Sequence, residues 1–280
     1  MTVRILVDST ADIPHDRAQK LNITVVPLLV LFGDTEYRDG IDLTTDAFYQ
    51  KLANTPVSPT TSAPSPGAFE EAFREALQGA DAVLALNIAS QLSATHNNAV
   101  RAAAVVAGET GKRIEVLDSG TVSGGFGMPA EILAQEAQNG ASLDDLKAHA
   151  VSMFSRIHLH AALDTLEYLQ RGGRIGRARQ LIGSLLNVKP LLEVRDGQVL
   201  PVENVRTRAK AQERVGQISA GFKPIEAMAI VESSAAVGEQ YDAIARTFYD
   251  GVIYHYALGP VVGTHAGPGA GGIVVLTAQQ

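Results

Sequence analysis

Cysteine and tryptophan are both absent from the 280 residues of this chain, and aromatic side chains make up only 5% of it. The lack of cysteine excludes disulfide bonds, thiolate metal sites and cysteine nucleophiles together. Few aromatic rings are available to stack on bases, which argues against binding of single-stranded nucleic acid. The net charge of −7 argues against nucleic acid in general, since phosphate backbones require a basic surface.

Long apolar runs are absent as well. No run of eighteen apolar residues occurs, so the sequence predicts no membrane span. The first residues lead directly into an expected strand and lack the charged-then-apolar layout of a signal peptide. We therefore expect a soluble cytoplasmic protein. Apolar residues nevertheless make up 46% of the chain, which is ample for the core of one large or two modest domains.

Short apolar runs alternate with segments of helical period through the first half of the chain. This alternation predicts a parallel sheet with helices on both faces, an α/β/α sandwich. The expected strands are residues 3–7, 25–32, 82–86 and 114–117, and the expected helices lie near 16–21, 47–52, 69–77, 97–107, 131–138 and 143–154. Ser65 followed by Pro66 is typical of a helix cap and a first helical position.

The second half has a different pattern. Residues 191–195 and 198–202 flank Asp196-Gly197, which is a clear hairpin signal. Further strands are expected at 157–163, 227–232, 252–256 and 273–276, with helices near 208–218 and 238–249. The sequence therefore predicts an α/β protein of two tightly packed domains, residues 1–155 and residues 156–280, the second an α+β domain with a mixed sheet covered by helices on one side.

The segment from Leu166 to Gly176 contains a pair of glycines bracketed by arginines. Gly172 and Gly173 allow backbone N–H groups to turn toward one point, while Arg171 and Arg174 add positive charge and planar donors. Such a corner suits a carboxylate or a phosphate. The same spacing is equally compatible with a helix that ends at a glycine and is followed by a new helix with solvated arginines.

Hydroxyl side chains are expected at a second polar location. Thr61 and Ser62 directly precede one predicted helix, and Ser93 follows a strand and precedes another. In an open parallel sheet both positions fall at the carboxyl edge of the strands, where ligands gather, and at helix N-termini, which favour anions. On local grounds these hydroxyls could equally be ordinary helix caps.

Histidines offer weaker signals. His265 lies in a glycine-rich turn between two apolar strands, where a loop histidine at the surface is the plain alternative. His158 and His160 share one face of a predicted strand, but no carboxylate or third histidine lies nearby in sequence. A solvated strand face is therefore favoured over a metal site, and no metal is expected.

Two further patterns suggest chemistry only superficially. The glycine-rich residues 123–127 match neither a P-loop nor the dinucleotide fingerprint, so we interpret them as close backbone packing beside a ligand site. Asp8 and Ser9 could be combined with His265 as a hydrolytic triad, but no Gly-x-Ser-x-Gly elbow supports that assignment.

Six motifs occur along the chain in a recognisable order. They are residues 5–14 (ILVDSTADIP), 61–65 (TSAPS), 92–96 (LSATH), 116–119 (VLDS), 166–197 and 263–269 (GTHAGPG). Together they resemble the signature of the DegV family of bacterial fatty-acid-binding proteins over nearly the full chain. The chain departs from that pattern at Ala63, where the family usually has glutamine, and at Ala94 and His96 in the third motif.

The resemblance implies a two-domain DegV-like lipid carrier with a buried acyl tunnel. The expected ligand is a long-chain fatty acid such as palmitate, stearate or oleate, with no other cofactor. The residues implied at its carboxylate are Thr61, Ser93, His265 and Arg171 or Arg174, supported by Ser62, Gly172, Gly173, Gly267 and Gly269.

The resemblance also implies a partner, a separate ATP-dependent fatty acid kinase subunit that phosphorylates the bound carboxylate for phospholipid metabolism. A basic segment around Arg206 is expected to dock that subunit. On this view the chain binds and presents lipid and is not itself an enzyme. The alternative is a stand-alone hydrolase or phosphotransferase that acts on a small polar substrate through His265 or Ser93.

Overall fold

Four parallel strands form the first sheet of the protein, whose computed structural model describes residues 2–182 and 188–279. The strands are β1 (Val3–Asp8), β2 (Thr24–Val26), β6 (Ala82–Asn87) and β7 (Arg113–Asp118), in the order β2-β1-β6-β7. β1, β6 and β7 begin within one residue of their predicted positions. Leu185, Leu186 and Asn187 of the fifth sequence motif lie outside the described residues.

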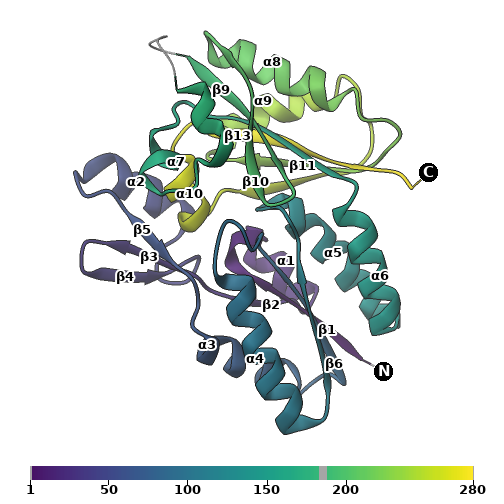
Figure 1. Ribbon diagram of the computed structural model, residues 1–280. Helices are drawn as coiled ribbons and strands as arrows, with labels where there is room; N and C mark the ends of the chain where they lie inside the picture. The colour runs from purple at the N-terminus through teal and green to yellow at the C-terminus, as the bar shows by residue number, and fades with distance from the viewer. Residues whose placement is uncertain (1, 183–187, 280) are drawn as a thin grey trace.

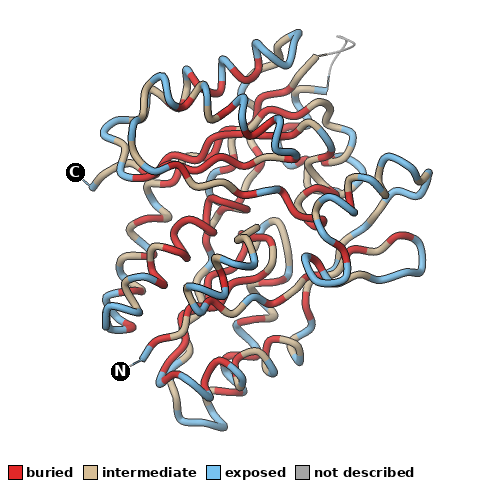
Figure 2. Tube along the Cα trace, turned by 180° about the vertical axis from the view of Figure 1, so that it is seen from behind, coloured by how far each residue is buried: buried red, intermediate tan, exposed pale blue. Residues whose placement is uncertain are grey.

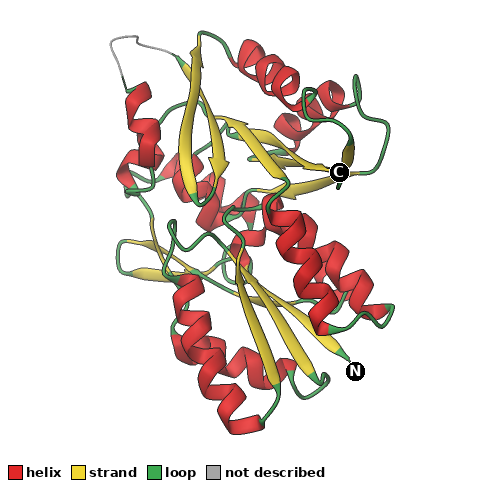
Figure 3. Ribbon diagram, turned by 45° about the vertical axis from the view of Figure 1, so that its right-hand side comes forward, coloured by secondary structure: helices red, strands yellow, loops and turns green. Residues whose placement is uncertain are grey.

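Helices cover both faces of this sheet because its strands are apolar on both sides. Leu6 and Ala85 pack under α3 (Pro66–Ala76) and α4 (Thr95–Thr110), while Ile5 and Leu84 face α5 (Gly124–Gln138) and α6 (Leu143–Phe154). Figure 3 shows the two helical layers on either side of the strands. The predicted α/β/α arrangement is confirmed, and α1 (His15–Lys20) and α2 (Thr45–Asn54) also lie where helices were expected.

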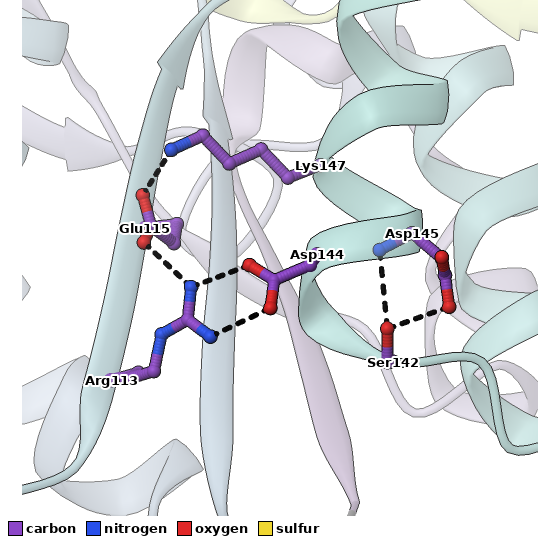
Figure 4. Close-up of polar contacts among 6 residues, drawn as sticks. All are labelled: Arg113, Glu115, Ser142, Asp144, Asp145 and Lys147. Atoms are coloured by element: carbon purple, nitrogen blue, oxygen red, sulfur yellow. Dashed lines mark hydrogen bonds and ion pairs between the residues drawn. The ribbon is translucent and has the colours of Figure 1, made fainter.

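An ion-pair network fixes α6 beside the edge strand β7 (Figure 4). Arg113 contacts Asp144 at 2.7 Å and Glu115 at 3.2 Å, and Lys147 reaches the other oxygen of Glu115 at 2.7 Å. The Ser142 hydroxyl caps the helix by accepting a hydrogen bond from the N–H three residues on. Because these charges are largely exposed, they orient the helix more than they stabilise the fold.

The single strand predicted at residues 25–32 is wrong. Pro27 interrupts it, since proline has no N–H to continue a sheet ladder. The chain after Pro27 leaves the first sheet and forms β3 (Leu29–Phe32), which pairs antiparallel with β4 (Thr35–Arg38) and β5 (Thr60–Ser62). This small sheet, which was not predicted, stands to one side of the first sheet (Figure 1).

Helix α5 begins earlier than the predicted residue 131. Glycines at its start disfavour a helix by propensity, but close packing requires them. A Cβ atom on Gly124 would lie 2.7 Å from the Tyr256 ring, and one on Gly127 would lie 2.4 Å from the carbonyl oxygen of Ala11. The predicted close backbone packing of this segment is therefore confirmed.

Six strands form the second sheet, in the order β10-β9-β8-β13-β11-β12. They are β8 (Ile157–Ala162), β9 (Lys189–Arg195), β10 (Gln198–Val205), β11 (Ile225–Glu232), β12 (Ile253–Ala257) and β13 (Gly271–Thr277). Only β11 and β12 pair in parallel; the other described pairs are antiparallel, so the sheet is mixed, as predicted. Helices α8 (Arg208–Ser219) and α9 (Ala235–Ala245) cover one face of it.

The expected solvated face around His158 and His160 is wrong. The His160 side chain is buried, and the His158 ring stacks on Phe222 with ring centroids 3.9 Å apart. Phe222 follows α8, which lies over this face of the sheet, and its ring centroid is also 5.6 Å from that of His160. Burial lowers the pKa of His160 to about 4, so its ring is neutral near pH 7.

The other face of the second sheet turns toward the first half of the chain. One apolar cluster extends from Ile5 and Leu84 in the first sheet, through Leu133 of α5, to Leu159 and Val274 in the second sheet. Figure 2 shows buried segments running through both sheets and the helices between them. The two sheets therefore share one core, and the candidate site opens within it.

Candidate functional site

A cavity of about 940 Å³, including its open mouth, lies between the second sheet and the first half of the chain. Aliphatic side chains make most of its wall, namely Leu28, Ile88, Leu92, Val122, Leu159, Leu163, Leu169, Leu192, Val194, Val199, Val231, Leu258, Val261 and Val262. Such a wall can hold an extended apolar chain.

The polar side chains in the cavity wall include Thr61, Ser93, Arg174 and His265. Thr61 Oγ1 and His265 Nε2 are 2.9 Å apart. Arg174 donates to the carbonyl oxygen of Leu92, the neighbour of Ser93, at 3.1 Å. The contact between Thr61 and His265 joins residues 204 positions apart in the sequence. We call Thr61, Ser93, Arg174 and His265 the polar end of this largely aliphatic cavity.

His265 lies in the last turn of a short helix, α10 (Pro260–Ala266), and not in the glycine-rich turn that was predicted. Gly267, just after it, ends the helix with a positive φ of 76°. Burial lowers the pKa of His265 to about 4, and repulsion from Arg174 adds to that effect. The imidazole is therefore neutral at pH 7 and has a single N–H group, which can donate a hydrogen bond to Thr61 or to a ligand oxygen.

Gly172 ends helix α7 (Glu167–Arg171) directly against the imidazole. A Cβ atom at Gly172 would lie only 2.1 Å from His265 Nδ1, so no larger residue fits while the ring keeps this position. Gly173 follows with φ of +70°, which glycine adopts without strain. Gly267 and Gly269 also have positive φ angles and pack closely on Tyr168 and on a carboxylate respectively. Of these four glycines, Gly172 is the one whose added Cβ would meet His265.

The structure separates the two arginines of the motif. Arg174 lines the cavity and is held by its hydrogen bonds to Leu92 and, at 2.6 Å, to the carbonyl oxygen of Gly172. A guanidinium has five N–H donors, so it retains donors for a ligand. Arg171 is exposed, pairs with Glu167 and donates to the Ser58 hydroxyl at 3.1 Å, outside the residues that line the cavity.

The two predicted hydroxyl positions have different surroundings. Ser93 lies at the start of α4, as expected, and its Oγ accepts a hydrogen bond from the Thr95 N–H at 3.3 Å. Thr61 does not lie at the edge of the parallel sheet or at a helix start, because it belongs to β5 and pairs with Val30 of β3. The adjacent Ser62 is exposed and does not line the cavity.

The suggested triad does not form among the described residues. Ser9 donates its hydroxyl hydrogen to Asp39 at 2.7 Å, while Asp8 accepts a hydrogen bond from the Ile88 N–H at 2.8 Å. His265 instead contacts Thr61. Arg206 is exposed in the turn between β10 and α8 and lies outside the cavity lining.

Two polar residues in the wall were not predicted as ligand-site residues, Thr10 and Ser123. Ser123 has a positive φ of 56° and contacts Asp12 Oδ2 at 2.5 Å. Its place after a strand and before glycines was visible in the sequence, but that pattern did not show which way the hydroxyl points.

Comparison with known proteins places this chain in a family. The family described as "Uncharacterised protein, DegV family" matches residues 2–278. The chain belongs to the DegV family. A DegV domain-containing protein from Streptomyces coelicolor is 36% identical in an alignment of 283 residues that covers 98% of each chain. Another from Deinococcus radiodurans is 35% identical in an alignment of 280 residues that covers 98% of each chain.

Solved DegV-family structures share the whole fold. A DegV-family protein from Thermus thermophilus, described by its fatty acid binding, is 32% identical with a TM-score of 0.88 and covers 99% of this chain and 100% of its own. DegV from Bacillus subtilis, described as a fatty acid binding protein, has a TM-score of 0.88 at 29% identity and 99% coverage of each chain. A stearic acid-binding protein from Eubacterium ventriosum has a TM-score of 0.88 at 27% identity and 97% coverage of each.

These matches confirm the predicted family and its α/β fold with a parallel and a mixed sheet. Within residues 2–182 and 188–279, no helix has the length and apolar character needed to cross a membrane.

Proposed function

We propose that this DegV-family protein binds one long-chain fatty acid, with the acyl chain in the aliphatic cavity and the carboxylate at its polar end. The observation that carries this proposal is the presence of Thr61, Ser93, Arg174 and His265 in the wall of a largely aliphatic cavity, with Thr61 and His265 in contact. Solved family members that are 27–32% identical and described as fatty-acid-binding proteins support it.

The free energies of burying the acyl chain and the carboxylate favour this placement of the ligand. Burial of about fourteen methylenes contributes roughly 11 kcal/mol before the costs of binding, at about 0.8 kcal/mol for each methylene. A buried carboxylate without hydrogen-bond partners would offset much of that gain. The tail therefore supplies affinity, whereas the hydroxyls, the imidazole and the guanidinium compensate the charge and fix the orientation. Arg174 is the arginine that we assign to the ligand, because it lines the cavity and Arg171 does not.

The test is direct. Protein purified without added lipid is extracted with organic solvent, and the extract is analysed by mass spectrometry for a stoichiometric acyl chain. Palmitate added to delipidated protein should raise its melting temperature, because a ligand that binds only the folded state stabilises it. Methyl palmitate, which has the same tail and no charge, should raise it less. If neither extraction nor added palmitate shows binding, the proposal fails, and the enzyme alternative with Ser93 or His265 becomes the one to test.

We further propose that the protein acts in the cytoplasm as a substrate-presenting subunit and not as an enzyme. A separate ATP-dependent kinase would phosphorylate the carboxylate held at the polar end of the cavity. Support comes from the family resemblance of the motifs and from the exposed basic side chain of Arg206. The test compares acyl-phosphate formation by a cognate kinase with Arg206→Glu and with Arg101→Glu, an equal change of charge on the exposed face of α4.

Docking through Arg206 predicts reduced turnover for Arg206→Glu only, with unchanged palmitate affinity. The effect should fade with added salt, because an exposed charge contact is screened. Equal turnover of both variants would remove Arg206 from the docking surface.

We also propose that the chain comprises two domains, residues 1–155 and 156–280, with the ligand between them. The first sheet and its helices precede this boundary, and the second sheet follows it. Limited proteolysis should be slower across the boundary when palmitate is bound, since the ligand contacts both parts.

A further inference from the structure

The N-terminus of α10, the helix that carries His265, rests on two carboxylates from the first half of the chain. The Gly259 N–H donates to Asp12 Oδ1 at 3.0 Å, and the Val261 N–H lies near Asp39 and favours the charged form of that carboxylate. Asp39 is 5% exposed and also accepts the Ser9 hydroxyl hydrogen at 2.7 Å. Both carboxylates therefore have donors from the chain itself, which explains them as helix contacts without any metal ion.

These contacts matter because α10 cannot hold its own position. It has only seven residues, and isolated helices shorter than about 12–15 residues are marginal in water. The first N–H groups of a helix lack partners within it, and negative charge near them is favourable. Gly259, at the cap position, has no side chain to supply an acceptor. Asp12 and Asp39 supply it from outside.

The remainder of α10 is packed closely against α2. A Cβ atom on Gly263 would lie 2.7 Å from the Phe48 ring and 2.8 Å from the Tyr49 hydroxyl oxygen. His265 lies about 9 Å along the axis from Gly259, at about 1.5 Å per residue. A shift at the capped end is therefore carried to the imidazole.

Asp12 also reaches the cavity wall from a second direction. Its Oδ2 lies 2.5 Å from the hydroxyl oxygen of Ser123, which lines the cavity at the start of α5. Burial and the neighbouring Asp39 raise the pKa of Asp12 well above its usual range. The Ser123 hydroxyl donates to one oxygen of Asp12 while the other oxygen accepts from the Gly259 N–H. One side chain thus ties together the starts of α5 and α10.

We propose that Asp12 and Asp39 are positioning residues for the ligand carboxylate: they fix α10 so that His265 stands at hydrogen-bonding distance from Thr61. This inference rests on the proposed fatty-acid binding. It assigns a purpose to two acidic residues that do not touch the ligand, one in the opening DSTAD motif and one in the loop after β4.

A pair of substitutions at one position separates positioning from backbone strain. Asp12 has a φ of 54°, a conformation that asparagine and glycine both tolerate. Asp12→Asn keeps an oxygen for the Gly259 N–H and an NH₂ group for Ser123, whereas Asp12→Gly removes both. We expect Asp12→Asn to bind palmitate like the wild type and Asp12→Gly to bind it about tenfold more weakly. Methyl palmitate affinity should change less than about twofold in either variant, because its tail contacts are retained.

A second variant disturbs the contact between the start of α10 and the two carboxylates without altering either carboxylate. A Cβ atom on Gly259 would lie 3.0 Å from Asp12 Oδ1 and 3.3 Å from Asp39 Oδ1, so Gly259→Ala should push α10 away from both. The φ of −65° at this position suits alanine. We expect the same selective loss of palmitate affinity. Asp34→Asn, an exposed acid in the turn before β4, is the control and should bind as the wild type does.

A spectroscopic readout keeps the test independent of lipid. NMR titration should show the His265 pKa near 4 in the wild type and in Asp12→Asn, and a pKa closer to 6.5 in Asp12→Gly and Gly259→Ala, where the ring loses its buried position. Equal losses for palmitate and its ester, or unchanged affinity together with an unchanged His265 pKa in both disruptive variants, would overturn the positioning role. If the wild type binds no palmitate, the proposed function fails, and the NMR arm alone decides the positioning.

Discussion

Replacing Gly172 with alanine gives a sharp test of the carboxylate site, because the backbone tolerates the change and the imidazole does not. Gly172 has φ of −75° and ψ of −6°, a conformation open to any residue. The added Cβ would lie 2.1 Å from His265 Nδ1 and 2.6 Å from Cε1, whereas ordinary contact begins near 3.4 Å. The ring must therefore move by about 1.3 Å, the difference between these two distances.

A movement of that size is enough to break the 2.9 Å hydrogen bond between His265 and Thr61 and to misplace the ring for a ligand. A hydrogen bond to a charged group contributes about 1.5–3 kcal/mol, so palmitate should bind about 10-fold to 150-fold more weakly. Isothermal titration calorimetry with palmitate and methyl palmitate measures this loss, which should be smaller for the ester.

Gly173→Ala is the matched control. Its φ of +70° makes alanine strained, but no atom lies within 4 Å of the added Cβ. It should lower the free energy of unfolding by about 1–2 kcal/mol without weakening palmitate binding. In a His265→Ala background, Gly172→Ala should cost no further affinity, because the clash is gone. Wild-type affinity in Gly172→Ala, or the same loss in both backgrounds, would refute the reasoning.

Three other outcomes are expected. Thr61→Val, which keeps the shape of the strand residue, should weaken palmitate binding by about 1–3 kcal/mol in calorimetry and leave methyl palmitate less affected. Arg174→Lys should reduce palmitate affinity more than Arg171→Lys, since lysine lacks the planar donors that Arg174 directs to the cavity. His160 stays neutral in the folded protein down to a pKa of about 4 and gains a proton near pH 6.5 when unfolded, so its contribution to stability is lost as pH falls from 6.5 toward 4. Between pH 7 and 4.5 the wild type should therefore lose about 2 kcal/mol more of unfolding free energy than His160→Phe, measured by urea denaturation at both pH values.

The regular elements of this fold could be predicted because their signals are local. The short apolar runs of β1 and β6 and the cap at Ser65 need only neighbouring residues. Errors arose where distant contacts decide the outcome. Helix α5 tolerates its early glycines only because Tyr256 fills the space above them, and His160 is buried only because Phe222 covers it. Pro27, by contrast, was a local signal in the sequence that one long strand would be interrupted.

The candidate site shows the same limit more strongly. No spacing rule brings Thr61 to His265, since β5 reaches that position only by pairing with β3. The order of family motifs pointed to both residues without any geometry. Asp12 and Asp39 gave no functional signal at all, because what they do depends on a helix that begins some 220 residues later along the chain than Asp39.

The cavity wall is not separate from the protein's core. Leu159, Leu192, Val194 and Val231 line the cavity and also belong to the apolar cluster that joins the two sheets. An acyl chain lying among them would act as one more core side chain, supplied from outside the polypeptide. We therefore expect the cell's lipid supply to set the lifetime of this protein as well as its occupancy, because proteases degrade the unfolded fraction that a bound ligand suppresses.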